Sequence, residues 1–209
     1  MRSAPQKQPM PKTAVCIEVG HGSTIEFPRT KCEVFIVSGY WMTMQLGDME
    51  PRQFLVSDIE AALALNNANS PAVGEIDRST LEFLIEHSLY SFAIGTDALH
   101  GFCITFAPGA PYTSVNYQWF SRKYPNFVYL DRIVVSEEMR NRSLGAKLYS
   151  AVEKRMIKDR CAPLLTCEVN LNPPNHGSIR FHKRIGFVEV GQQDSKPGLT
   201  VSMLAKTVG

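Results

Sequence analysis

The sequence predicts an α/β (α+β) fold in which a mixed sheet is covered by helices. The order of elements is the first observation: two helices come first, then an antiparallel pair of strands, then strands and helices in alternation. Composition is the second, because 44% hydrophobic and 20% charged residues are typical of a globular protein. Length is the third, since 209 residues suit one domain with an appendage.

The first 50 residues differ from the rest of the chain. They lack a sustained hydrophobic period, are punctuated by proline and glycine, and contain one predicted strand, residues 32–37. From Arg52 onward, periodic segments follow one another with short connections. We therefore predict an N-terminal extension over residues 1–50, partly disordered or loosely packed, and one domain over residues 51–209.

The first half of the predicted domain contains two helices followed by two strands, expected over residues 53–66, 77–87, 91–96 and 101–106. Asp77 is the expected N-cap of the second helix. A polar and aromatic segment, residues 107–126, follows the strands, and we predict no regular element in it.

The second half alternates strands and helices. Strands are expected over residues 127–135, 164–171, 187–191 and 200–205, with helices over residues 144–156 and 175–185. Gly186 is a natural residue to end the last helix. The strand at 127–135 is rich in β-branched and aromatic residues, which favours a central position in the sheet.

The joint between residues 135 and 148 carries the chemistry. A strand ends there and a helix begins with small residues, so several backbone N–H groups and the positive end of the helix dipole point at one place. Arg140 and Arg142 add charged donors. The joint lacks both the P-loop and the dinucleotide fingerprint. Taken alone, it predicts a pyrophosphate site no more strongly than an ordinary helix start.

Two motifs make the chain similar to the GNAT superfamily of N-acetyltransferases. Residues 140–145 (RNRSLG) resemble the acetyl-CoA signature [RQ]xxGx[GA], and residues 175–187 (NHGSIRFHKRIGF) resemble NxxAxxxYxxxGF. The resemblance covers about residues 53–206 and implies a mostly antiparallel sheet with a splay between two central parallel strands. Ser143 replaces a glycine, which is tolerable if its φ is helical, whereas a required positive φ would weaken binding.

The resemblance implies acetyl-CoA as acyl donor, without a metal. It implies that backbone groups of the cofactor strand contact the pantetheine arm and that the turn after it binds the pyrophosphate. Asn175 would bind the pantetheine or adenosine side, and a helix N-cap is the competing explanation. The implied cofactor-binding residues are Ile133, Val134, Val135, Arg140, Asn141, Arg142, Ser143, Leu144, Gly145, Ala146 and Asn175.

Two residues are implied to be catalytic. Glu168 stands on the strand where some family members keep a general base, although it could instead bind the amine or pair with an arginine. Asp131 on the cofactor strand is its rival. His182 takes the place of the family tyrosine that protonates the CoA thiolate; CoA contact without chemistry and simple packing are the alternatives.

The implied reaction is acetyl transfer by direct attack of an amine, from a small molecule or a peptide, in a ternary complex. The alternative is a catalytically silent CoA-binding sensor, favoured by the departures at Ser143 and His182. Asn66 and Asn67 lie near the implied acceptor seat. Four aromatic residues could form an acceptor pocket, a homodimer contact or core: Tyr112, Tyr117, Trp119 and Phe120.

Composition limits the partners and the compartment. A net charge of +2 argues against a nucleic-acid binder, and no apolar run is long enough to span a bilayer. Five cysteines without a CxxC pair fit reduced thiols. We therefore predict a cytoplasmic protein that binds neither nucleic acid nor membrane.

Overall fold

The structure, a computed structural model, describes residues 17–19, 23–25, 33–37, 40–44, 49–70 and 73–209. The chain divides into two compact units, residues 1–46 and residues 47–209. In the first unit, two antiparallel strand pairs are described: β1 (Ile17–Val19) with β2 (Ser23–Ile25), and β3 (Glu33–Val37) with β4 (Tyr40–Met44). Of these, the sequence predicted only β3; residue 32, where that predicted strand began, lies outside the described residues.

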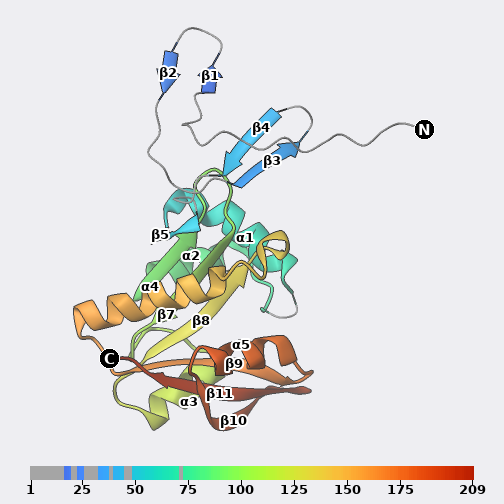
Figure 1. Cartoon of the computed structure of the whole chain (residues 1–209). Helices are drawn as coiled ribbons and strands as arrows, with labels where there is room; N and C mark the ends of the chain where they lie inside the picture. Colours follow the sequence, from blue (N-terminus) through green and yellow to red (C-terminus); the bar gives the residue numbers. More distant parts are fainter. Residues whose placement is uncertain (1–16, 20–22, 26–32, 38–39, 45–48, 71–72) are drawn as a thin grey trace. The chain divides into compact units, whose positions relative to one another are not determined.

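The second unit is built on a seven-stranded sheet with the strand order β10-β11-β9-β8-β7-β6-β5 (Figure 1). Its strands are β5 (Pro51–Gln53), β6 (Tyr90–Ile94), β7 (Gly101–Phe106), β8 (Val128–Val135), β9 (Leu164–Asn172), β10 (Val188–Lys196) and β11 (Leu199–Thr207). All neighbouring pairs are antiparallel except β8 and β9, which are parallel. The predicted mixed, mostly antiparallel sheet is confirmed.

Helices cover both faces of this sheet. They are α1 (Ile59–Ala68), α2 (Arg78–Glu86), α3 (Val115–Lys123), α4 (Leu144–Asp159) and α5 (His176–Arg184), with short 3₁₀ turns η2 (Val56–Asp58) and η3 (Glu137–Met139). Buried residues of α1, α2 and α3 share one apolar cluster with the sheet. The apolar side of α4 packs on the opposite face, and α5 lies against β9.

Several elements differ from those predicted, and four of the differences have a clear physical reason. The first helix begins at Ile59 because Pro51–Gln53 pair with β6 as a strand and Val56–Asp58 form the 3₁₀ turn. The segment 107–126 contains α3, whose N-cap is Ser114. The strands β10 and β11 extend beyond their predicted ends because each is the hairpin partner of the other over its full length.

A β-bulge on β8 sets the geometry of the centre of the sheet. Arg132 pairs with Ile104 and Leu130 pairs with Thr105, so Asp131 is the extra residue. The extra residue shifts the alternation of faces by one position. Odd-numbered residues before the bulge (Phe127, Tyr129) and the even-numbered Val134 after it therefore face the cluster shared with α1, α2 and α3.

The two central parallel strands separate almost at once. Only two residue pairs join β8 to β9, Val128 with Leu165 and Tyr129 with Thr166. Beyond them β8 pairs only with β7, and β9 only with β11, among the residues that the structure describes. This confirms the splay that the resemblance implied.

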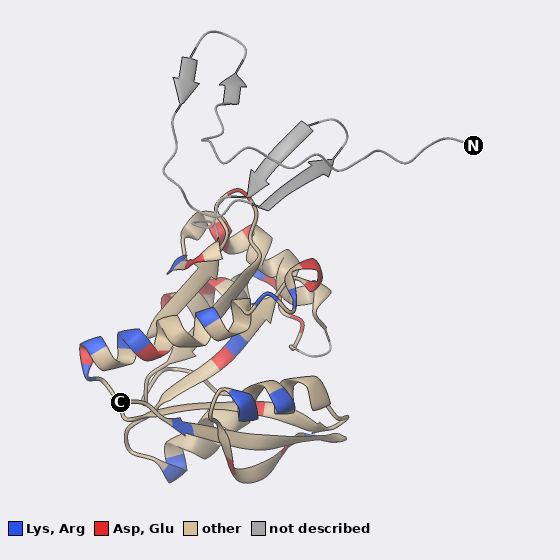
Figure 2. Ribbon diagram, viewed as in Figure 1, with Lys and Arg blue, Asp and Glu red and all other residues tan. Residues whose placement is uncertain are grey.

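Basic residues are distributed along α4 and α5 (Figure 2). Within the described ranges, no helix is long and apolar enough to cross a membrane. The same ranges contain no group of three or more His, Cys, Asp or Glu side chains placed to hold a metal ion.

Candidate active site

The turn before α4 has an unusual backbone. Asn141 has a φ of 63° and Ser143 a φ of 62°, both in the left-handed region that favours glycine. Asparagine tolerates this region better than serine does. The sequence left open whether the φ of Ser143 is helical or positive; the structure shows the positive φ, which is the less favourable case for serine.

The start of α4 presents free backbone donors. Ser143 is the N-cap residue but makes no side-chain cap hydrogen bond, and the first helical bond runs from the Lys147 N–H to the Ser143 carbonyl. By helix geometry, the four N–H groups from Ser143 to Ala146 have no acceptor inside the helix. This is the arrangement that an anionic pyrophosphate needs, so the residues present fit the predicted cofactor.

Gly145 is small for a packing reason as well. A Cβ atom there would lie 3.3 Å from Cζ of Phe181, so the missing side chain allows α4 to approach α5 closely. Leu144 beside it is buried in the core. Of the basic residues, Arg140 donates to Oδ1 of Asn69 at 2.8 Å, which directs its guanidinium toward α1; Arg142 is exposed.

The strand residues predicted to meet the pantetheine arm lie at the splay. Val135, Val134 and Ile133 pair with β7 on one side, and the register to β9 ends before them on the other. Asn175 is the N-cap of α5, where its Oδ1 accepts from the Ser178 N–H at 3.1 Å. The structure thus shows the N-cap alternative for Asn175, and its contact with the cofactor stays a prediction.

Glu168 lies on β9, two residues past the last pair with β8. Its cross-strand partner Met203 belongs to the cluster shared with α1, α2 and α3, so Glu168 points to that face of the sheet. The Tyr129 hydroxyl lies 3.0 Å from Oε1 and 2.8 Å from Oε2, and Nδ2 of Asn116 donates to Oε1 at 3.0 Å.

The surroundings of Glu168 favour a base that works near neutral pH. Burial, followed by the negative charge of Asp131, raises the pKa of Glu168 to about 7, against the donors on Tyr129 and Asn116, which lower it. Burial also raises the pKa of Asp131, which accepts a 2.6 Å hydrogen bond from Tyr112 and pairs with Arg132 at 3.1 Å. The two carboxyl groups stand on the two strands that form the splay.

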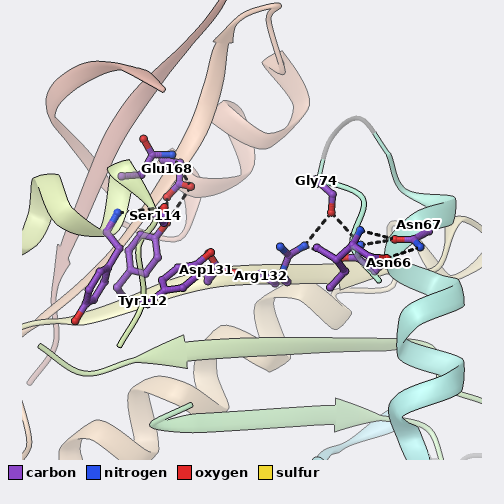
Figure 3. Close-up of polar contacts among 12 residues, drawn as sticks. Asn66, Asn67, Gly74, Tyr112, Ser114, Asp131, Arg132 and Glu168 are labelled. Atoms are coloured by element: carbon purple, nitrogen blue, oxygen red, sulfur yellow. Dashed lines mark hydrogen bonds and ion pairs between the residues drawn. The ribbon is translucent and has the colours of Figure 1, made fainter. Parts of the chain in front are cut away.

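Arg132 uses its charge to hold the loop between α1 and α2. Its Nη1 donates to Oδ1 of Asn66 at 2.9 Å and to the Gly74 carbonyl at 3.0 Å, in a group of contacts separate from those of Glu168 on β9 (Figure 3). Asn67 donates to the Ile76 carbonyl and accepts from the Ile76 N–H. The side chains of Asn66 and Asn67 therefore hold this loop together.

His182 is buried on α5, with both ring nitrogens engaged. Nδ1 lies 2.8 Å from the Ser178 carbonyl, an acceptor, so it carries a proton; Nε2 lies 2.7 Å from the Tyr149 hydroxyl and accepts from it. Burial lowers the pKa of His182. These contacts favour the neutral ring, and the acid role predicted for His182 receives no support from them.

The aromatic residues of the segment 107–126 predicted to form a pocket, a dimer contact or core all pack within the second unit. Tyr117 and Phe120 are buried core residues of α3. Tyr112 stacks on Phe106 with ring centroids 4.5 Å apart and reaches Asp131. Trp119 lies over Gly191 of β10.

Sequence reasoning missed three polar partners of the site: Asn116, Tyr129 and Tyr149. Tyr129 and Tyr149 come from a predicted strand and a predicted helix, Asn116 from a segment with no predicted element, and their partners are 33 to 52 residues distant in the chain. No motif marks any of the three, so the sequence carries no specific signal for them.

Comparison with known proteins agrees with this architecture. The family described as Acetyltransferase (GNAT) family matches residues 64–187. No curated protein matches the chain by sequence.

Solved structures resemble the fold. The ribosomal-protein-S18-alanine N-acetyltransferase from Escherichia coli is 16% identical with a TM-score of 0.57, over 76% of this chain and 93% of that one. NAA60 from Arabidopsis thaliana, in complex with a bisubstrate analogue, is 16% identical with a TM-score of 0.61, over 75% and 96%. Ard1 from Thermoplasma volcanium is 17% identical with a TM-score of 0.59, over 76% and 97%.

Proposed function

The chain belongs to the acetyltransferase (GNAT) family, whose reaction transfers an acetyl group from acetyl-CoA to an amine, and we propose that Glu168 is the general base of this reaction. The protein is thus an acyl-CoA-dependent N-acetyltransferase. The observation that carries the proposal is the position of the Glu168 carboxyl group at the splay, with a pKa of about 7.

An amine reaches the enzyme mainly as an ammonium ion and must lose a proton before it can attack. A carboxylate with a pKa near the working pH is a suitable acceptor for that proton, because it is ionised often enough and its conjugate acid is not too strong. The nearby Asp131 helps to keep the pKa of Glu168 in this range. Acetyl-CoA supplies the activated acetyl group.

The donor site proposed for acetyl-CoA consists of the residues predicted from the sequence. The N–H groups at the start of α4 would bind the pyrophosphate, and the edge of Ile133–Val135 that lies past the register with β9 would bind the pantetheine arm. The same edge would offer an N–H group, of Val134 or a neighbour, to the acetyl carbonyl oxygen. His182 stays the candidate acid for the thiolate, and replacing it with phenylalanine tests that role.

We propose a peptide α-amine as the first acceptor class to test. Support comes from the names of the structural relatives, which include a ribosomal-protein-alanine acetyltransferase and a NatC complex bound to a Gag peptide. A small-molecule amine is the alternative. Homodimer formation and a cytoplasmic location stay predictions.

Thiol release from acetyl-CoA, followed over a panel of peptides, amino acids, polyamines and aminoglycosides, tests the proposal. With the best acceptor, Glu168→Gln should lower kcat/KM by roughly 10²–10⁴-fold, the range typical of a general base. The Kd for acetyl-CoA should not change. The control is Glu82→Gln, which removes an exposed carboxylate on α2. A Glu168→Gln enzyme that keeps its rate within a few fold would exclude the base role.

A further inference from the structure

Asn116 of α3 stands between Glu168 and the β10–β11 hairpin. We propose that Asn116, fixed by Ser195 of β10, is a positioning residue that holds the Glu168 carboxylate in the orientation and charge state for proton transfer. The proposal rests on the base role proposed for Glu168. It makes α3 part of the catalytic apparatus, although the helix contributes no side chain that takes part in the chemistry.

The orientation of the Asn116 amide is determined by its two partners. Asn116 is 7% exposed; its Nδ2 donates to Oε1 of Glu168 at 3.0 Å, and its Oδ1 accepts from the Ser195 hydroxyl at 2.6 Å. A flipped amide would point Oδ1 at the carboxylate, so that two acceptors would face each other without a proton. The carboxylate, which can only accept, therefore selects the donor end of the amide, and the Ser195 hydroxyl holds the other end by donating to Oδ1.

These contacts leave one carboxylate oxygen less occupied than the other. The Tyr129 hydroxyl has a single proton and lies nearer to Oε2, at 2.8 Å, than to Oε1, at 3.0 Å. Asn116 occupies Oε1. Since each carboxylate oxygen has two lone pairs, Oε2 retains one to receive the proton of the acceptor amine.

The helix that carries Asn116 is fastened along β10 by several contacts. Lys123 donates to the Val190 carbonyl at 2.5 Å, and Gln193 of β10 donates to the Val115 carbonyl at 3.3 Å. Trp119 lies so close over Gly191 that a Cβ atom there would be 2.5 Å from the indole. A helix held at both ends and in its middle can place an amide more reproducibly than a loop can.

The charge state of Glu168 depends on all the groups that face it. These are Asp131 and Tyr129 of β8 and Tyr112 of the segment before α3, while Cys167 of β9 and Tyr149 of α4 interact with it electrostatically from the other face of the sheet. Burial and Asp131 favour the protonated acid, whereas the Tyr129 and Asn116 donors favour the carboxylate. Loss of the Asn116 donor should therefore raise the pKa of Glu168 and leave less base at neutral pH.

A direct titration tests this without an acceptor. The side-chain carboxyl carbon of Glu168 is followed by ¹³C NMR in the full chain, and Glu168→Gln identifies its resonance. We expect a midpoint near pH 7 in the parent protein and a midpoint about one pH unit higher in Asn116→Ala. Ser121→Ala is the matched control, because that α3 hydroxyl donates back to the Tyr117 carbonyl within its own helix. An unchanged midpoint in Asn116→Ala would overturn the proposal.

Ser195 provides a second test that leaves the buried asparagine in place. Ser195→Ala should shift the midpoint in the same direction by a smaller amount, and Ser195→Thr, which keeps the hydroxyl, should restore it. If neither Ser195→Ala nor Asn116→Asp moves the midpoint, the positioning role is wrong even where Asn116→Ala does not fold.

Kinetics separate this proposal from the one on which it rests. The pH dependence of kcat/KM is measured by thiol release with the best acceptor from the panel. In Asn116→Ala its acidic limb should move to higher pH by the same amount as the NMR midpoint, so that kcat/KM falls about tenfold at pH values below the limb. The acceptor's own titration is common to both enzymes. Full activity of Glu168→Gln would refute the base role, whereas a dead Glu168→Gln with an unshifted Asn116→Ala limb would refute only the positioning role.

Discussion

At the scale of single residues, the ionisation of Glu168 links catalysis to stability. Its pKa in the folded protein, about 7, lies above the ordinary value of 4.5, so the folded state binds more protons than the unfolded state between these values. Stability from this group is therefore present at low pH and is lost as the pH rises toward 7.

Glu168→Gln should therefore stabilise the protein at pH 8 while it lowers kcat/KM. The expected gain is up to about 3 kcal/mol in the free energy of unfolding, because a neutral amide replaces a buried carboxylate. Urea unfolding at pH 5 and pH 8 measures it. The gain should be smaller at pH 5, and equal effects at both pH values would contradict the linkage.

Ser143 offers a second prediction at this scale. Ser143→Gly should stabilise the fold by about 1 kcal/mol, because glycine adopts a φ of 62° without the Cβ penalty. Asn141→Gly, at nearly the same φ, is the matched control and should gain less, since asparagine tolerates the left-handed region. Thermal unfolding compares the two; a melting temperature that falls in Ser143→Gly would show that the hydroxyl matters more than the strain.

The sequence pointed to the α4 turn through a short motif read along the chain, and to Glu168 through its place on a strand that the family resemblance implied. It could not predict Asn116 or Ser195, since 52 residues separate Asn116 from Glu168 and 79 separate it from Ser195. Such partners are brought together only by the packing of α3. The positive φ of Ser143 was likewise beyond the motif, which shows a substitution but not a backbone angle.

At the scale of elements, α3 depends on the absence of a side chain at one position of β10. Gly191→Ala should push Trp119 away and lower the melting temperature, because the new Cβ would lie 2.5 Å from the indole. It should also reduce activity through the displaced Asn116. Thermal unfolding and thiol release together measure the effect.

Gly74→Ala is the control for this change, since a Cβ atom at Gly74 meets nothing within 4 Å. The double variant Gly191→Ala with Trp119→Phe should recover part of the loss by making room. An unaltered melting temperature in Gly191→Ala would mean that α3 can shift on β10 at little cost.

The missed α3 and the late start of α1 have physical explanations. The α3 segment places a polar residue, Asn116, among its buried positions, which weakens the apolar period on which prediction depends. Residues 51–53 become a strand because β6 offers them an edge, and no local pattern in three residues reveals that partner. The long amphipathic α4 and the β-branched β8 carried strong patterns and were predicted nearly to their ends.

At the scale of the whole molecule, the seven-stranded sheet and its core lie within residues 47–209. A chain that begins at residue 47 should therefore have a melting temperature within about 3 °C of that of the full chain. This corresponds to a difference of less than about 1 kcal/mol in the free energy of unfolding. Circular dichroism on both chains checks this. A large fall would show that residues 1–46 stabilise the second unit.

The matched control is a chain that begins at Phe54. It lacks β5 and also Arg52, whose guanidinium donates two 2.7 Å hydrogen bonds to Asp58 and one to the Gly95 carbonyl. Loss of β5 would expose the edge of β6, and loss of Arg52 would leave the buried Asp58 carboxylate without its partner. We expect this shorter chain to be clearly less stable.

The two residue pairs between β8 and β9 have a consequence for the dynamics of the sheet. With so few backbone bonds across its centre, the sheet consists of a four-stranded half, β5–β8, and a three-stranded half, β9–β11. Separating β8 from β9 breaks few backbone hydrogen bonds, so the amides along these two facing edges should exchange with deuterium sooner than those of β7 or β11. A donor bound between the halves would hold them together, and slower exchange there would report its occupancy before any acetyl group is transferred.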